Sequence, residues 1–343
     1  MDHTTHSSAR DLEARRFDPS ASVEDNLCCA LKYTVLAPSS HNTQPWRFLL
    51  DDDTVLVCAD RLRALPVVDP FDRELIISCG AALLNLRVAL SHFGMGYTIG
   101  TFPSDVDPDL IARVRIVQDG FRDPRLGALF AAIPDRVTTR EPFGDDPLPD
   151  ALLQRIVDAA ATEGAQAVCV TSVAERALIA DLIAEADRMQ FADPRFRREL
   201  ASWIHPRRRD DGMPAYGARV SGLLDFATPV VASVIRTFDV GGGMAAVHQR
   251  LVEGSPVLIG IGTESDDRDA WLAAGQALER VLLTAADTGY TASYLNQPIE
   301  VDALRLRLRT LLRMTGEPQL LIRVGRGPAV PHAPRRPLRD VIS

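Results

Sequence analysis

The sequence predicts a protein of mixed helices and strands in which two halves of the chain follow a similar order. Apolar residues recur four apart before residue 37, which indicates an amphipathic helix (Val23, Leu27, Leu31 and Val35). Two apolar runs then flank the acidic turn Asp51-Asp52-Asp53, which indicates a β-hairpin. Helices and strands in a similar order recur after residue 149, and a long-period duplication is the economical explanation.

In the first half, Ser22 and Asp25 can start the first helix as a capping box, and Pro38 ends it. The segment 74–93 predicts a second helix, apolar on most of its faces, which is typical of a central and buried helix. Gly94 stops this helix. The strands expected in this half are 46–50, 54–58, 97–99 and 114–117.

In the second half, a helix starts at Pro149 and Asp150, and Ser172 with Glu175 forms another capping box before a helix that reaches Met189. The other expected elements are strands at 167–171, 255–262, 290–294 and 319–324, and helices at 269–287 and 301–313.

Two short patterns support the duplication. Gly80-Ala81-Ala82-Leu83 opens a helical stretch that ends before Gly96-Tyr97-Thr98. Gly275-Gln276-Ala277-Leu278 opens a similar stretch that ends before Gly289-Tyr290-Thr291. A chance recurrence of Gly-Tyr-Thr is the alternative, and the shared order of elements argues against it.

Composition excludes several classes of protein. At 343 residues and 46% hydrophobic content, the chain is long enough for one large or two ordinary domains. A formal net charge of −8 argues against a general nucleic-acid surface. The N-terminus is polar, unlike a signal peptide, and no run approaches the roughly 18 apolar residues of a membrane span. We therefore expect a cytoplasmic protein without a membrane partner. The five cysteines and seven histidines show no metal-ligand spacing, so we expect buried, reduced thiols and no metal.

The stretch 37–48 connects the first helix to the first strand and carries an unusual set of side chains. Two prolines stiffen it, and five hydroxyl or amide side chains crowd into it. A loop this polar and rigid suits a ligand with many carbonyl and N–H groups, although an ordinary turn is the alternative.

The same stretch resembles the flavin-binding signature of the nitroreductase family, FMN-dependent NAD(P)H oxidoreductases. The pattern is Pro-Ser-x-x-Asn-x-Gln-Pro-Trp-x-Phe, and the matching residues are Pro38, Ser39, Asn42, Gln44, Pro45, Trp46 and Phe48. In that family the Ser and Asn groups contact FMN from the partner subunit of an intertwined dimer. The resemblance implies that Pro38, Ser39, Ser40, Asn42 and Gln44 bind FMN.

The second half opens with a run that resembles the family's Arg-x-Ser-x-Arg/Lys motif, which grips the FMN phosphate. Arg136, Thr138 and Arg140 map onto it, and a planar guanidinium can meet a phosphate through two parallel hydrogen bonds. The alternative is a solvated basic turn in a loop with no buried role. The first half has no such motif.

Two later segments also resemble parts of the family's flavin site. Pro298 and Glu300 lie in Gln-Pro-Ile-Glu, which resembles the Pro-x-Glu-Gly segment that lines the flavin ring, with Val301 in place of the glycine. Arg335 and, second, Arg336 lie in a closing segment whose basic residues approach the phosphate in the family. A plain basic tail is the competing interpretation.

The motifs are divided between the halves, and each half lacks what the other retains. We therefore expect one FMN site between the halves and a second, symmetric site that no longer binds FMN. We also expect that a monomer is sufficient for FMN binding. The expected organisation is a polar tail at 1–20, a first half at 21–133 and a second half at 134–343. Within the second half, 190–250 is a possible lid insertion that includes a mobile-looking Gly241-Gly242-Gly243.

The whole pattern resembles the two-repeat, mycobacterial Acg-type branch of the nitroreductase family. The resemblance implies an α+β fold with a mostly antiparallel sheet in each half. It also implies transfer of hydride from NAD(P)H to FMN and then to a nitroaromatic, a quinone or a similar small-molecule acceptor, with no catalytic side chain. One alternative is a protein that stores or sequesters FMN under a lid. A scaffold without flavin is a weaker alternative.

Overall fold

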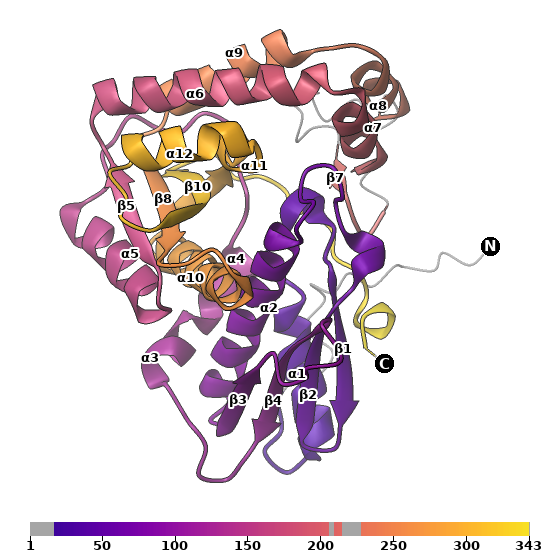
Figure 1. Ribbon diagram of the computed structural model, residues 1–343. Helices are drawn as coiled ribbons and strands as arrows, with labels where there is room; N and C mark the ends of the chain where they lie inside the picture. Colours follow the sequence, from indigo (N-terminus) through magenta and orange to yellow (C-terminus); the bar gives the residue numbers. More distant parts are fainter. Residues whose placement is uncertain (1–16, 206–208, 215–227, 343) are drawn as a thin grey trace.

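The computed structural model describes residues 17–205, 209–214 and 228–342, and it contains two four-stranded antiparallel sheets (Figure 1). The expected N-terminal tail therefore lies outside the described residues up to residue 16, as do Arg207 and Arg208. Both sheets are antiparallel throughout, and helices cover them. The prediction of an α+β fold is confirmed.

The two sheets have the same strand order. In the first sheet the chain's first strand pairs with the second, the second with the fourth, and the fourth with the third. The second sheet repeats this arrangement. The strands of the first sheet are β1 (Trp46–Asp51), β2 (Thr54–Ala59), β4 (Leu110–Ile116) and β3 (Tyr97–Thr101). Those of the second are β5 (Gln166–Val170), β8 (Val257–Thr263), β10 (Glu317–Gly325) and β9 (Thr291–Tyr294).

Two long helices cross at the centre of the molecule, α2 (Arg73–His92) and α10 (Arg268–Ala286), with the sheets on either side (Figure 1). They approach backbone to backbone at Gly80 and Gly275. A Cβ atom built on Gly275 would lie 2.0 Å from the Ile77 carbonyl oxygen, and one built on Gly80 would lie 2.4 Å from the Leu272 carbonyl oxygen. The glycine that opens each recurring helical pattern is therefore a packing requirement.

Each sheet has its own hydrophobic core, and the crossing joins the two. α1 (Val23–Thr34) and α2 pack on the first sheet, whereas α5 (Asp150–Thr162) and α10 pack on the second. Leu272 of α10 belongs to the first core and Ile77 of α2 to the second. Because each long helix contributes to both cores, the two halves form one body.

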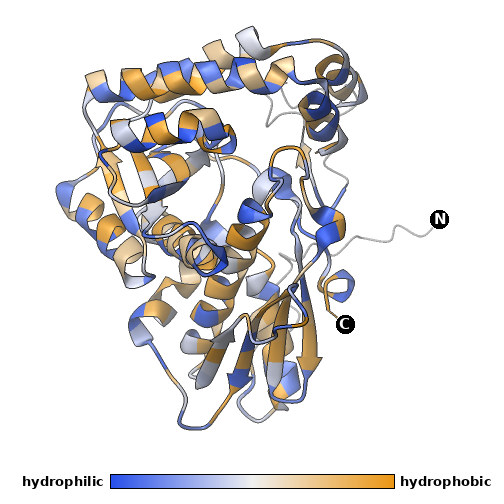
Figure 2. Cartoon of the chain, in the orientation of Figure 1, coloured by the Kyte–Doolittle hydropathy of each residue, from blue (hydrophilic) through white to orange (hydrophobic). Residues whose placement is uncertain are grey.

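Helix α2 is long and apolar enough to cross a membrane, with a mean hydropathy of 1.5, contrary to the expectation that no run approaches such a span. Its apolar stretch is 83% buried inside the protein, and Figure 2 shows the apolar residues of this helix and the neighbouring strands at the centre of the fold. A helix of this kind is typical of a protein core. The pair formed by α8 (Thr228–Thr237) and α9 (Gly241–Glu253) passes the same test only as one span broken by a 114° bend.

The segment between β5 and β8 forms a helical insertion. The insertion begins with α6 (Val173–Ala192), which starts at the capping box of Ser172 and Glu175. Helices α6 and α9 run together across the second sheet (Figure 1). Gly241–Gly243, which we expected to look mobile, form the first turn of α9, where the Asp239 carboxylate accepts the Gly241 N–H at 2.9 Å. The other elements here are α7 (Pro194–Ser202), β6 (Ile204–His205) and β7 (Met213–Pro214).

The C-terminal segment returns to the first sheet. The chain passes through α11 (Gln297–Glu300), α12 (Asp302–Leu311) and β10 and then reaches β1 of the first sheet. There the Phe48 N–H donates to the Val341 carbonyl at 2.7 Å. Two short helices, α3 (Pro124–Gly127) and α4 (Ala132–Asp135), connect the halves. None of the five cysteines forms a disulfide; Cys28 and Cys169 are partly exposed, contrary to the expectation of burial.

Candidate functional site

The loop between α1 and β1 is held in an unusual backbone conformation. Ser40–Asn42 forms a 3-10 turn, and three residues have positive φ: His41 at 52°, Asn42 at 55° and Gln44 at 52°. Left-handed backbone is uncommon for residues other than glycine and costs of order 1–3 kcal/mol each. Contacts maintain it, because the Ser39 hydroxyl accepts the Gln44 N–H at 2.9 Å. Such strain often marks a functional loop.

The loop's amide side chains bind other parts of the chain. Asn42 Nδ2 donates to the Gly212 and Pro334 carbonyls at 3.0 and 3.1 Å. Gln44 Nε2 donates to the Asp210 carbonyl at 2.8 Å, and Gln44 Oε1 accepts the Arg336 N–H at 2.8 Å. In this structure the two amides therefore join the first half to the insertion and the C-terminal segment.

Three arginines from beyond residue 135 converge on this loop. Arg136 Nη2 donates to the Leu36 carbonyl at 2.5 Å. Arg335 Nη2 donates to the same carbonyl at 3.1 Å, and Arg335 Nη1 donates to Asn42 Oδ1 at 3.1 Å. Arg140 lies beside Met213, with Nη2 3.4 Å from the sulfur. The structure thus brings together first-half and second-half residues that the motifs nominated.

Arg136 has a buried role, contrary to its interpretation as a loop arginine without one. Only 4% of its side chain is exposed, and its Nε lies 3.3 Å from Glu279 Oε1 on α10. Glu279 is fully buried, and burial raises the pKa of its carboxyl to about 7 although the charge of Arg136 opposes this. The sequence carried no signal for this ion pair, because Glu279 lies in a different element.

His41 Nε2 and the Tyr294 hydroxyl are buried without a hydrogen-bond partner in the described part of the chain, and the charge of Arg140 acts on both side chains. Burial and the charge of Arg140 lower the pKa of His41 to about 4, so its ring is neutral near pH 7. Burial raises the pKa of Tyr294 and keeps its hydroxyl protonated. Sequence reasoning missed both residues, although His41 lies inside the motif.

Thr138 does not accompany the arginines. The Thr138 side chain is exposed, whereas that of the next residue, Thr139, is buried. The Thr139 hydroxyl has no hydrogen-bond partner among the residues that the structure describes. Successive side chains of an extended segment point to opposite sides, so if the Thr138 side chain faced the arginines, the Thr139 side chain would face solvent. Buried Arg323 fixes this segment by donating to the Thr139 and Glu141 carbonyls at 2.9 and 2.8 Å.

A second cluster lies at the other side of the loop, where Glu300 meets the N-terminus of α2. The Ser40 hydroxyl donates to the Glu74 carboxylate, and Gln190 Nε2 donates to Glu300 Oε2 at 2.6 Å. Burial, together with the charge and contact of Glu74, raises the pKa of Glu300 well above its ordinary value. The pKa of nearby Asp69 rises to about 7 by burial and the charge of Glu74. The carboxyls of Glu300 and Asp69 therefore keep their protons to a higher pH than exposed carboxyls do.

The remaining nominated residues lie close to these two groups. Pro298 is buried in α11 beside Glu300. Arg336 points away from the three arginines: its Nη2 donates to the Asp340 carbonyl at 2.8 Å, and its Nη1 lies 3.6 Å from Asp60. Across the described residues, no group of three or more His, Cys, Asp or Glu side chains could hold a metal ion.

The donor set around the loop fits an anionic group. Arg136, Arg140 and Arg335 interact with one carboxylate, Glu279, or with the neutral His41 and Tyr294 side chains, so positive charge is in excess. Phosphates are recognised by such fixed cations and hydrogen-bond donors. Fold and site together define a two-sheet α+β protein with an arginine-lined anion site where its halves meet.

Comparison with known proteins gives the family. The model of the Nitroreductase family matches residues 133–326, which include Arg136, Arg140 and Glu300. "Putative NAD(P)H nitroreductase Rv3131" of Mycobacterium tuberculosis (strain ATCC 25618 / H37Rv) is 32% identical over 91% of this chain and 89% of its own. The chain belongs to the nitroreductase family.

Two further relatives match nearly the whole chain. "Putative NAD(P)H nitroreductase acg" of the same M. tuberculosis strain is 30% identical over 92% of this chain and 95% of its own. "Probable NAD(P)H nitroreductase PigM" of Serratia sp. (strain ATCC 39006) is 25% identical over 93% of this chain and 94% of its own. These matches extend beyond the second half, to which the family model is confined.

Proposed function

We propose that this protein is an FMN-binding oxidoreductase that takes hydride from NAD(P)H and passes it to a nitroaromatic, a quinone or a similar acceptor. The observation that carries the proposal is the convergence of Arg136, Arg140 and Arg335 on the Leu36–Asn42 loop. Three relatives that match most of the chain are named NAD(P)H nitroreductases.

The residues divide the work of holding FMN. Arg140 and Arg335 would bind the phosphate, while Arg136 is committed to Glu279 and the Leu36 carbonyl and sets the positive field. Tyr294 and His41 supply further polar atoms that have no hydrogen-bond partner in the structure's described part. When bound, FMN supplies the hydride-accepting and hydride-donating chemistry, and the protein binds, orients and tunes it.

We also propose one FMN per chain, a duplicated chain that works as a monomer, and a location in the cytoplasm. The connection from α5 to β5 consists of residues 163–165, whereas the equivalent first-half connection spans 35–45. Glu163 in the short connection is paired with Arg87 of α2 and with Arg280 of α10, whose Nη2 lies 2.6 Å from its Oε1. This ion-pair cluster leaves no polar loop for a second flavin.

A second function, holding FMN without turnover, is favoured by the position of the insertion. Its Asp210 and Gly212 carbonyls accept hydrogen bonds from Gln44 and Asn42, and its Met213 lies beside Arg140. A segment bound this closely to the nominated loop would restrict access of a donor or acceptor to the flavin.

Anaerobic mixing of the FMN-loaded protein with NADPH separates the two functions. Rapid bleaching of the flavin's visible band supports the oxidoreductase, whereas an unchanged spectrum supports storage. Dithionite serves as the control, since it should bleach the flavin in either case. A chain that retains no flavin after incubation with FMN and desalting would refute both.

A further inference from the structure

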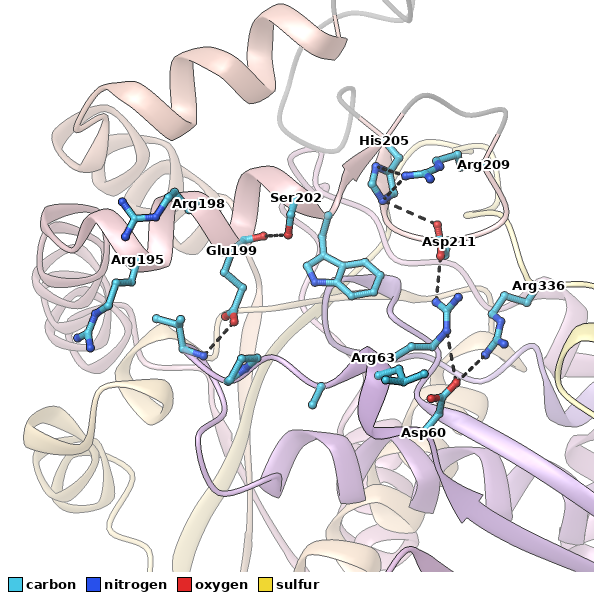
Figure 3. Close-up of a pocket in the computed structure, with 15 residues that line it drawn as sticks. Asp60, Arg63, Arg195, Arg198, Glu199, Ser202, His205, Arg209, Asp211 and Arg336 are labelled. Carbon is cyan, nitrogen blue, oxygen red and sulfur yellow. Dashed lines mark hydrogen bonds and ion pairs between the residues drawn. The ribbon is translucent and has the colours of Figure 1, made fainter.

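A cavity of about 890 Å³ lies next to the candidate flavin loop, because its lining residue Arg336 donates its backbone N–H to Gln44 at 2.8 Å. Its walls come from the connector 60–67, from α7, from Arg336, and from four residues of the insertion, Trp203, His205, Arg209 and Asp211 (Figure 3). Small-molecule sites commonly have volumes of about 300–1,000 Å³. Its charged lining comprises Arg63, Arg195, Arg198, Arg209 and Arg336, with Asp60, Glu199 and Asp211.

One wall holds two guanidiniums, Arg63 and Arg336, that share the Asp60 carboxylate. Arg63 contacts Asp211 at 2.9 Å and Asp60 at 3.6 Å, and Arg336 approaches the same Asp60 oxygen at 3.6 Å. Burial and the charge of Arg63 lower the pKa of Arg336. Asp60 and Asp211 match these two cations in number, so the surplus of positive charge in the cavity comes from its other walls.

Two of the cations on the other walls, Arg198 and Arg209, make no ion pair with a carboxylate in the described part of the chain, whereas Arg195 pairs with Asp193 at 2.9 Å. Arg209 contacts the His205 ring, and burial with the charge of Arg209 lowers the pKa of that imidazole, so the ring is no counter-ion. Arg198 makes no hydrogen bond or ion pair among the residues that the structure describes, although its charge helps to lower the pKa of Asp193. Glu199 is committed, because it accepts the Val67 and Val68 N–H groups at 2.9 Å each.

Figure 3 shows these cations on two sides of the cavity, with Arg195 and Arg198 on one side and Arg63, Arg209 and Arg336 on the other. Trp203 also lines it and offers an aromatic surface. A cavity with cations on two sides and an indole in its lining suits a ligand that combines a planar ring with more than one phosphate.

We propose that this cavity binds the adenosine end of the electron donor and selects NADPH over NADH through its 2′-phosphate. The inference rests on the proposed function and adds the choice of donor to it. The Arg336 backbone N–H donates to Gln44 of the flavin loop at 2.8 Å, so a nucleotide here would end beside the flavin site. The extra phosphate carries about −1.5 to −2 charges, which the excess of guanidiniums would meet.

Calorimetric titration of the full-length, FMN-loaded protein with three probes tests the proposal. Adenosine 2′,5′-bisphosphate should bind about 10-fold or more tighter than 5′-AMP, because one charge-assisted contact contributes about 1.5–3 kcal/mol. Inorganic pyrophosphate should bind more weakly than the bisphosphate, because it lacks the ring that Trp203 would stack on.

Charge-reversal variants assign the site. Arg198→Glu and Arg209→Glu should each weaken bisphosphate binding about 10-fold and leave 5′-AMP binding less affected. Arg313→Glu is the matched control: its side chain lies just after α12, is 83% exposed, pairs with Glu175 and does not line the cavity. Flavin content should be unchanged in all three variants.

Each outcome decides the inference. Equal affinity for bisphosphate and 5′-AMP, equal affinity for pyrophosphate and bisphosphate, or equal losses in the control and the two cavity variants would overturn it. The probes contain no nicotinamide, so they report on this cavity whether or not the flavin turns over. An inert flavin with selective bisphosphate binding would therefore sink the oxidoreductase but not the nucleotide site.

Discussion

Replacing Gly275 with alanine should open the central helix crossing. The new Cβ would lie 2.0 Å from the Ile77 carbonyl oxygen, whereas an ordinary carbon–oxygen contact is about 3.3–3.6 Å. The obstacle is backbone on a packed helix, so no rotamer change relieves it, and α2 and α10 must separate by more than about 1 Å.

The expected cost follows from two opposing terms. Overpacking of a core costs typically about 1–3 kcal/mol, occasionally more, and a backbone clash of this depth belongs at the upper end. Alanine gains about 1 kcal/mol over glycine in a helix. We therefore expect Gly275→Ala to lower the free energy of unfolding by about 2 kcal/mol, measured by urea denaturation.

Gly243→Ala is the matched control. Gly243 is also helical, in α9, but nothing lies within 4 Å of a Cβ built there. This variant should be neutral or stabilised by up to about 1 kcal/mol. If Gly275→Ala proved as stable as the wild type or the Gly243 variant, the close approach of α2 and α10 at Gly275 would be refuted.

Other perturbations address the site. Arg136→Ala should lower the free energy of unfolding by about 3–5 kcal/mol, because it leaves Glu279 buried without its partner; an unchanged urea midpoint would contradict the buried pair. Arg140→Ala should weaken FMN binding about 10-fold to 150-fold in a fluorescence titration, with little effect on unfolding; wild-type affinity would exclude it from the phosphate site. Burial raises the pKa of Glu300, so above about pH 4.3 this carboxyl binds more protons in the folded chain than in the unfolded chain. The free energy of unfolding therefore falls as the pH rises from there toward the pKa of the folded state. Glu300→Gln should therefore flatten the decline in stability between about pH 5 and 7, whereas the exposed Glu185→Gln should reproduce the wild-type slope; equal slopes would refute the shifted pKa. Released flavin should amount to one FMN per chain and light scattering of the FMN-loaded protein should give a monomer; a ratio near two, or flavin loss on dilution of a dimer, would reject these expectations.

Local chemistry predicted the regular elements well. The Ser22 and Ser172 capping boxes start helices where expected, and the turn between β1 and β2 has the left-handed residue that tight hairpins need, Asp52 at φ 51°. The apolar run that became α2 predicted a buried helix, and that helix lies at the centre. These features depend on neighbours a few residues apart, which a sequence displays directly.

The site was harder to predict because its contacts are distant in sequence. Asn42 binds the Gly212 carbonyl across 170 residues, and no local pattern announces that contact. Thr138 was nominated where Thr139 faces inward, a one-residue difference that reverses the side of an extended segment. The sequence around Arg136 suggests a solvated loop residue, because its buried partner, the Glu279 carboxylate, belongs to the distant helix α10.

The two equivalent strand pairs are connected very differently. β1 joins β2 through a turn at Asp52 and Asp53, whereas β5 joins β8 through the whole helical insertion. In a symmetric pair of identical subunits, any segment inserted into the gene would appear twice and cover both ends of the assembly. A single chain is free of that constraint. Its gene can lengthen one connection, and so reshape the entrance to one site, while the opposite connection keeps its minimal length.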